Sequence, residues 1–133
     1  MPSFASYMEE VMTLLTTQIE VIAYLAKQGG ARTPASIRTH LLKTYKARLK
    51  KYPELASELK ELVPSYVTFR KRLEKLKKFG ILTAKREKHK TKKGTYTITK
   101  YSLSPRFLRF LASEKAKKGV KLPSKLEKIL ENI

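Results

Sequence analysis

The segment Phe69–Leu82, FRKRLEKLKKFGIL, constrains the fold of this chain more than any other stretch. Six of the nine residues that follow Phe69 are Lys or Arg, yet Phe69, Leu73 and Leu76 recur at the spacing of one helix face. Gly80 then favours a helix end, and the hydrophobic period changes to two. The segment therefore predicts a helix that packs through a narrow apolar stripe and leads directly into a β-strand.

A β-hairpin is predicted immediately after this helix. The runs ILTAKREK (81–88) and TYTITKYSL (95–103) alternate with period two, and the second is rich in Thr, Tyr and Ile. Between them HKTKKG (89–94) is typical of a polar turn that ends in glycine. The hairpin is as basic as the helix before it, with six Lys or Arg between Ala84 and Gly94.

Apolar residues at spacings of three and four predict one continuous first helix from about Ala5 to Gln28. Gly29 and Gly30 favour its end, because glycine adopts a left-handed helix end at little cost. Four further apolar residues lie off the main stripe and make the helix apolar on more than one face: Met12, Leu14, Val21 and Tyr24. Such a helix either is central in the core or packs against a second chain.

Two helices are predicted between the first helix and the basic one. Thr33 suits an N-cap, and the proline after it suits the first helical position. The run PELASELKEL, residues 53–62, predicts a shorter helix with three leucines on one side: Leu55, Leu59 and Leu62. A proline breaks it, and Ser65 then suits the N-cap of the basic helix, which we place at about residues 65–79.

The chain after the hairpin is predicted to be helical again. Ser104 as N-cap and Pro105 begin a helix that a glycine and a proline interrupt, and SKLEKILENI (124–133) predicts a last short helix. The expected fold class is therefore mainly α with a β-hairpin. We expect one domain at residues 1–113 and a C-terminal helical extension at residues 114–133.

The charge of the chain indicates the class of its partner. Thirty Lys and Arg stand against eleven acids, a formal net charge of +19. Self-repulsion at this level opposes folding, so we expect a polyanionic partner, whereas solubility alone needs a net charge of only about 2–8. All eleven acids are Glu, Asp and Cys are absent, and amides are rare, a composition reported for hyperthermophile proteins.

A helical wheel separates the two faces of the basic helix. Tyr66 joins the apolar stripe, Arg70 and Lys77 lie on one flank, and Arg72 lies on the other. The face opposite the stripe carries Val67, Thr68, Lys71, Lys75 and Lys78. A short helix comes before and a tight turn follows, which is the order of a helix-turn-helix whose second helix enters the DNA major groove by its N-terminal half.

At this point the chain resembles the winged helix-turn-helix family, through VTFRKRLEKLKKFGIL (67–82) followed by GTYTITKYSLS (94–104). Family members often show two leucines three apart and a glycine four residues later, here Leu73, Leu76 and Gly80. The YTIT of the second strand is similar to the motif that closes the wing in PadR-type regulators. The segment between the first helix and the recognition helix is longer than in most members and holds two predicted helices where one is usual. The resemblance implies a winged helix-turn-helix with extra N- and C-terminal helices.

The resemblance also implies a function and a set of contacts. Such proteins are dimers that bind palindromic operators or partition sites in double-stranded DNA. Base contacts are implied for six residues of the recognition helix: Ser65, Val67, Thr68, Lys71, Arg72 and Lys75. Backbone contacts are implied for two more of its residues and for the basic wing, residues 84–94: Arg70, Lys78, Arg86, Lys88, Lys90, Lys92 and Lys93. Lys71 and Arg72 suit guanine O6 and N7, and Val67 or Thr68 suits a thymine methyl group.

No catalytic pattern accompanies these features. His40 and His89 lie on different predicted elements, and no Asp or Cys completes a metal site. QGGART (28–33) lacks the spacing of a phosphate-binding loop. We therefore expect no enzymatic activity, no cofactor and no metal, with His40 in a structural role. The chain lacks an apolar run typical of a membrane span or signal peptide, so we expect a cytoplasmic, nucleoid-associated protein.

Two other functions and two modes of assembly stay open. An RNA-binding or ribosome-associated protein would use Tyr96, Ile98 and Tyr101 as a stacking platform, and a chromatin protein would coat DNA without sequence preference. We expect a symmetric homodimer formed by the first helix and Pro105–Leu111. The last helix either adds to that interface or folds back on its own chain, and a further protein partner is left open.

Overall fold

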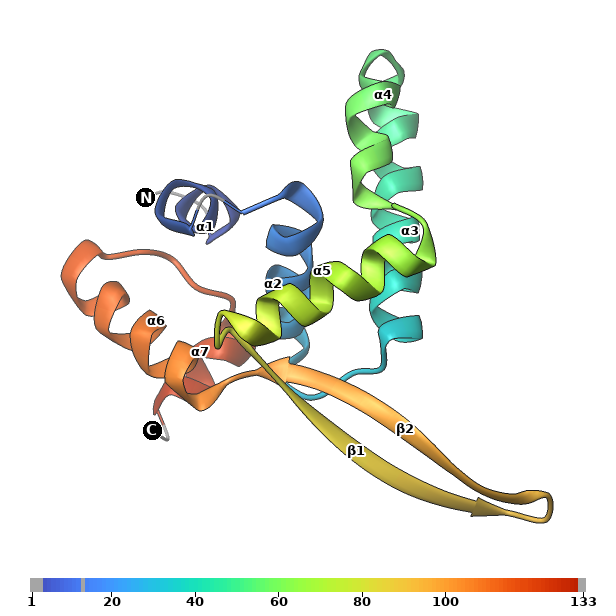
Figure 1. Cartoon of the computed structure of the whole chain (residues 1–133). Coiled ribbons are helices and arrows are strands. Elements are labelled where there is room, and N and C mark those ends of the chain that lie inside the picture. Colours follow the sequence, from blue (N-terminus) through green and yellow to red (C-terminus); the bar gives the residue numbers. More distant parts are fainter. Residues whose placement is uncertain (1–3, 13, 132–133) are drawn as a thin grey trace.

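The computed structural model describes residues 4–12 and 14–131 and shows a helical body from which a helical arm and a β-hairpin project (Figure 1). In chain order the elements are α1 (Phe4–Met12), α2 (Thr16–Gln28), α3 (Pro34–Lys51), η1 (Pro53–Leu55), α4 (Ala56–Leu59), η2 (Lys60–Leu62), α5 (Tyr66–Lys78), β1 (Leu82–Thr91), β2 (Gly94–Leu103), α6 (Pro105–Lys118) and α7 (Ser124–Glu131). α1, α6 and α7 gather on the side of the body away from the hairpin tip, and α5 packs on α2.

The N-terminal segment forms two helices where the sequence predicts one. α1 ends at Met12 and α2 begins at Thr16, and Phe4 and Met8 of α1 enter the same core as α2. The Gln18 side chain fixes the start of α2 by accepting a hydrogen bond from the Leu15 N–H at 3.2 Å. The prediction of a continuous helix was wrong. Apolar residues recur at helical spacing in both α1 and α2, and this pattern in the sequence does not reveal that the helix is interrupted between them.

The residues that lie off the predicted stripe of this segment have partners within the chain. Val21 is buried in the core, and Leu14 is half-buried against it. The Tyr24 ring stacks on His40 with 4.2 Å between ring centroids, while the side chain of Met12 lies outside the described part of the structure. The apolar excess of the first helical segment therefore does not by itself require a second chain.

α3 and the segment after it form the arm. Thr33 caps α3 as predicted, its Oγ1 accepting a hydrogen bond from the Ser36 N–H at 3.2 Å. Residues 53–62 form the short turns η1, α4 and η2 instead of one regular helix. Only Leu62 of the predicted leucine stripe is buried, and Leu55 is exposed. The segment is short and lies between two prolines, conditions under which tight 3₁₀ turns commonly replace α-helix.

β1 and β2 form the predicted hairpin, which is longer than the sequence pattern indicates. The antiparallel ladder continues to the pair Thr91 and Gly94, so that the turn contains only Lys92 and Lys93. Residues 89–91, expected in the turn, extend β1. Gly94 has a φ of 130°, a conformation that favours glycine. At about 3.3 Å per residue, each ten-residue strand spans about 33 Å.

One residue outside the hairpin also joins the sheet. Arg32 exchanges two backbone hydrogen bonds with Tyr101, at 2.9 and 2.8 Å, and so ties the base of the hairpin to the loop between α2 and α3. A strand is predicted from alternating apolar and polar residues, and a bridge formed by a single residue produces no such alternation. The sequence therefore does not predict the bridge at Arg32.

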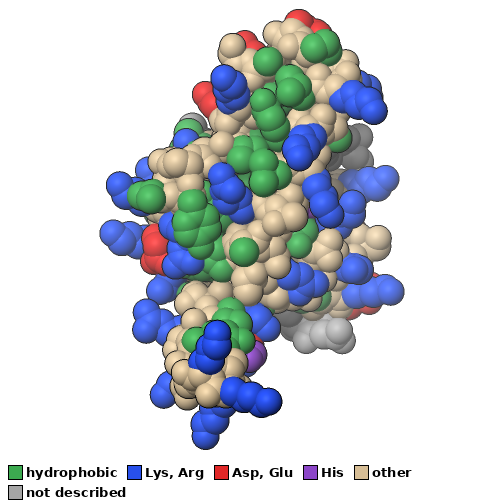
Figure 2. Space-filling view, turned by 90° about the vertical axis from the view of Figure 1, so that its right-hand side faces the viewer, with side chains coloured by type: hydrophobic (Ala, Val, Ile, Leu, Met, Phe, Trp, Pro, Cys, Tyr) green, Lys and Arg blue, Asp and Glu red, His purple; other side chains and the backbone are tan. Residues whose placement is uncertain are grey.

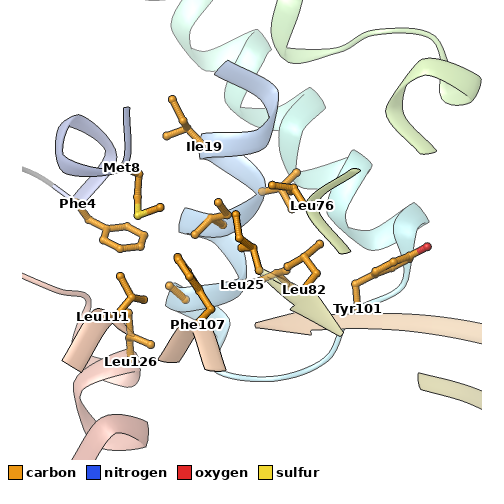
Figure 3. Packing of buried hydrophobic residues seen from close by; sticks show 14 of the residues in the cluster. Phe4, Met8, Ile19, Leu25, Leu76, Leu82, Tyr101, Phe107, Leu111 and Leu126 are labelled. Atoms are coloured by element: carbon orange, nitrogen blue, oxygen red, sulfur yellow. The ribbon is translucent and has the colours of Figure 1, made fainter. Parts of the chain in front are cut away.

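The C-terminal helices fold back on their own chain. Ser104 caps α6 as predicted, its Oγ accepting a hydrogen bond from the Phe107 N–H at 3.0 Å. α7 packs against α2 and α6, and Leu126 is fully buried in the core that Figure 3 shows. The boundary expected after Ser113 falls inside α6, and side chains from both sides of it enter one core cluster.

The fold class agrees with the sequence at a coarse level: the chain is mainly helical with a two-stranded antiparallel hairpin. The order of elements is compatible with a winged-helix-like arrangement. Within the described residues, no helix combines the length and the apolar character needed to cross a membrane.

We predict that Leu126→Ala lowers the free energy of unfolding by about 2–5 kcal/mol, because it leaves a cavity between α7 and the body. Urea unfolding followed by circular dichroism measures this loss. The exposed neighbour Lys125 gives a matched control, since Lys125→Ala should stay within about 0.5 kcal/mol of the parent chain. Equal stability of the two variants would contradict the folded-back position of α7.

Candidate nucleic-acid interface

α5 packs through its apolar stripe and exposes its basic face. Phe69, Leu73 and Leu76 have no exposed surface. Ser65 caps the helix by accepting a backbone N–H hydrogen bond at 3.3 Å. The opposite face carries the exposed Val67 and three cations, none of which pairs with a carboxylate in the described part of the chain: Lys71, Lys75 and Lys78. The charge of α5 is therefore directed outward, where an anionic partner has access to it.

Tyr66 departs from the predicted stripe. Its side chain is 49 % exposed, whereas Phe69, one turn further along, is completely buried. The two rings lie 6.5 Å apart. The helical wheel places Tyr66 only at the edge of the stripe, and the body does not extend far enough to cover the first turn of α5. Tyr66 is thus a surface residue that sequence reasoning assigned to the core.

Arg72 is held inside the chain rather than presented outward. Its Nη1 donates to the Thr17 Oγ1 at 2.5 Å and to the Glu61 carbonyl oxygen at 3.3 Å. The Thr17 hydroxyl also donates to that carbonyl. These contacts tie α5 to α2 and η2, and they use the guanidinium that was expected to contact guanine. The wheel places Arg72 on a flank, but only the fold shows that α2 and η2 lie beside that flank.

The strand register gives one side of the hairpin a regular row of cations. Arg86, Lys88 and Lys90 project from one side of β1, and each lies directly opposite a threonine of β2: Thr99, Thr97 and Thr95. We call these six residues the basic face of the hairpin. Neighbouring cations on β1 are two residues apart, about 6.6 Å along the strand. Ammonium, guanidinium and hydroxyl groups all donate hydrogen bonds to phosphate oxygens, so the row suits a sugar–phosphate backbone.

The other side of the hairpin is partly neutralised. Glu87 pairs with Lys100 at 3.1 Å and lies 3.5 Å from His89, whose ring stacks on Tyr96. The hydrogen bond from Lys100 holds the pKa of Glu87 below its usual value. Cross-strand pairs of this kind stabilise a hairpin. On this side Lys85 keeps an exposed charge, but most of the unpaired charge in the described hairpin lies on the basic face and at the tip, where Lys92 and Lys93 form the turn.

Tyr101 joins the hairpin to α5. It lies on the same side of the hairpin as the basic face, and its hydroxyl donates to Glu74 Oε1 at 2.5 Å. The Arg70 guanidinium lies 6.0 Å from the centre of the Tyr101 ring. Burial and then the nearby Glu74 carboxylate raise the pKa of Tyr101 to about 12. At its base the basic face is therefore turned toward α5, and Glu74, the one acid on α5, holds the two elements together.

The residues expected to contact DNA fall into three groups. Nine are exposed on α5 and the hairpin: Val67, Lys71, Lys75, Lys78, Arg86, Lys88, Lys90 and the pair Lys92 and Lys93 at the tip. Ser65 and Thr68 bond to each other through their hydroxyls at 3.1 Å, and Arg70 lies over Tyr101. Arg72 is engaged internally. Figure 2 shows the side from which the hairpin projects, where Lys and Arg surround the hairpin and border a band of hydrophobic side chains.

The two histidines lie in different environments. His40 stacks on Tyr24 in the body, and burial lowers its pKa. His89 lies on the hairpin beside Glu87. Within the described residues, no group of three His, Cys, Asp or Glu side chains is arranged to hold a metal ion.

We predict that Tyr101→Phe lowers the free energy of unfolding by about 1–2 kcal/mol at neutral pH, because it removes the bond to Glu74. The folded chain favours the neutral phenol, so this contribution is present below pH 10 and is lost as the pH rises through about 12. Urea unfolding across that range should show a smaller alkaline loss in the variant. Tyr7, whose pKa is also raised to about 12, contributes to the loss that remains. An identical alkaline loss in the two chains would contradict the role of Tyr101.

Comparison with known proteins adds no relative: no protein-family model matches the chain, and neither the curated proteins nor the solved structures include a significant match.

Proposed function

We propose that this chain binds double-stranded DNA as a winged helix-turn-helix protein, with α5 in the major groove and the hairpin as its wing along the phosphate backbone. One observation carries the proposal: two separate basic surfaces, the outward face of α5 and the basic face of the hairpin, meet at Tyr101. A helix with an unobstructed outer face suits the width of a major groove. A row of evenly spaced cations suits the adjacent backbone.

The role that fits best is a sequence-specific DNA-binding protein of the transcription-regulator or partition type. Val67 and Lys71 are exposed near the start of α5, the part of a recognition helix that contacts base edges. A protein that only coats DNA needs phosphate contacts alone. The exposed side chains at the start of α5 favour base contacts in addition.

The RNA-binding alternative loses its main support. Its stacking platform requires Tyr96, Ile98 and Tyr101 on one face of the sheet. Tyr96 and Ile98 share a face, but Tyr101 is three residues from Ile98 and lies on the other side, where its hydroxyl bonds to Glu74. Tyr96 is also covered in part by the His89 ring.

We predict that duplex DNA binding falls steeply with salt. If six to ten phosphates are contacted, the affinity should fall by roughly 10³–10⁵ between 50 and 200 mM salt, because bound counterions are released. Fluorescence anisotropy with a labelled duplex measures the affinity, and unlabelled structured RNA serves as competitor. A flat salt dependence, or displacement by RNA at lower concentrations than by duplex DNA, would overturn the proposal.

The two sides of the hairpin provide a matched control. Lys88→Ala or Lys90→Ala should lower the slope of log affinity against log salt by about 0.9, the value for one lost phosphate contact. Lys85 carries the same charge on the opposite side of β1, and Lys85→Ala should leave the slope nearly unchanged. Equal slopes for all three variants would show that only total charge matters and not the basic face.

A homodimer remains part of the proposal, because one recognition helix covers few base pairs and a symmetric pair would contact half-sites about 34 Å apart. The segments expected at the interface bury most of their apolar side chains within the chain. Among the side chains of these segments that the structure describes, those left for a partner are chiefly Leu15, which is 49 % exposed, and the half-buried Phe110.

We therefore predict a dimer that dissociates on dilution and that Leu15→Lys weakens. Sedimentation equilibrium over a range of concentrations measures the association. A chain that stays monomeric at tens of micromolar would contradict the dimer while leaving DNA binding open.

A further inference from the structure

The first turn of α5 presents apolar surface at the place where charge would be expected. Val67 is 65 % exposed and Tyr66 is 49 % exposed. Together with Phe79 at the other end of α5, they line an open hollow of about 870 Å³ on the outward face of the helix. Single exposed apolar residues are ordinary on protein surfaces. Here two are adjacent, at the end of the helix that a DNA-binding protein inserts.

The polar side chains nearest to them are already used. The Ser65 hydroxyl caps α5 and bonds to Thr68, so both hydroxyls have partners. Arg72 is bound to Thr17 and Glu61. Arg70 and Lys71 remain beside the apolar pair, and both carry positive charge. The first turn thus combines apolar contact at its centre with cations at its margin.

We propose, on the basis of the DNA binding proposed above, that Val67 and Tyr66 select thymine in the duplex by packing against its 5-methyl group. That methyl is the one apolar group that a base pair presents in the major groove. Arg70 binds a phosphate beside the contacted pair, and Lys71 contacts a neighbouring base edge, as proposed above. Charge decides between occupants of this surface, because Lys71, Lys75 and Lys78 line the same hollow and would repel the same face of a second copy.

The test removes single methyl groups from the DNA. Duplexes bound by the full chain are selected from a random library, and the best site is resynthesised with uracil in place of thymine at one position at a time. Uracil keeps the base pairing and the phosphates and lacks only the methyl. We expect affinity to fall about fourfold for each contacted methyl, the effect of one buried methyl or methylene group, with the salt slope unchanged.

Protein variants assign the contact to residues. In Val67→Ala the uracil effect should disappear at one position, and in Tyr66→Ala at a neighbouring position. Phe79→Ala is the matched control, because Phe79 is 58 % exposed at the far end of the same helix and its loss should leave both effects intact. Circular dichroism confirms that each variant is folded.

Each outcome decides the matter. A selected site without an invariant thymine, a selection that yields no site at all, or full affinity for every uracil duplex overturns the methyl contact. The methyl contact is also overturned if the loss of affinity for uracil duplexes persists in both Val67→Ala and Tyr66→Ala. DNA binding with normal salt dependence in those cases leaves the proposed DNA binding standing, although a selection without any site also removes its sequence-specific role. Absence of any DNA binding removes both the function and the methyl contact.

Discussion

Burial of three side chains, Phe69, Leu73 and Leu76, holds a strongly basic helix against a strongly basic body. The charges of α5 repel the rest of the chain, and this narrow apolar contact has to exceed that repulsion. Arg72 assists by turning one cation of α5 inward to an oxygen cluster at Thr17 and Glu61, and Glu74 assists by accepting the Tyr101 hydroxyl. The apolar stripe of α5 faces the body, so the opposite face of the helix has to face outward. Most of the remaining cations lie on that opposite face and therefore point away from the body.

Signals that act within a few residues were sufficient to predict the order of elements. Caps at Thr33, Ser65 and Ser104 form the expected hydrogen bonds, and the change of period at Gly80 marks the passage from α5 to the hairpin. Each cap depends on a backbone N–H group that bonds to a side chain nearby in the sequence, and the change of period is a pattern of neighbouring residues. These features can therefore be predicted from the sequence without knowledge of the rest of the fold.

Features that depend on distant neighbours were not predictable in the same way. The helical wheel places Lys71 on the outer face and Arg72 on a flank, but only the position of α2 and η2 shows that this flank is covered and that Arg72 is internal. Tyr66 belongs to the stripe on a wheel but lies beyond the edge of the body. The division of the first segment into α1 and α2 was missed for the same reason, since the core into which Phe4 packs is built partly by α6 and α7.

The length of the hairpin has a consequence for how such a molecule would meet a polyanion. Its strands reach about 33 Å, several times the screening length of about 8 Å at physiological ionic strength. Lys92 and Lys93 at the tip are thus electrically separate from the body, and they would attract an approaching polyanion before α5 does. A first encounter at the tip would restrict the search for the final orientation to rotation about one attached point. If the chain binds DNA as proposed, the hairpin would set its capture radius and α5 its selectivity.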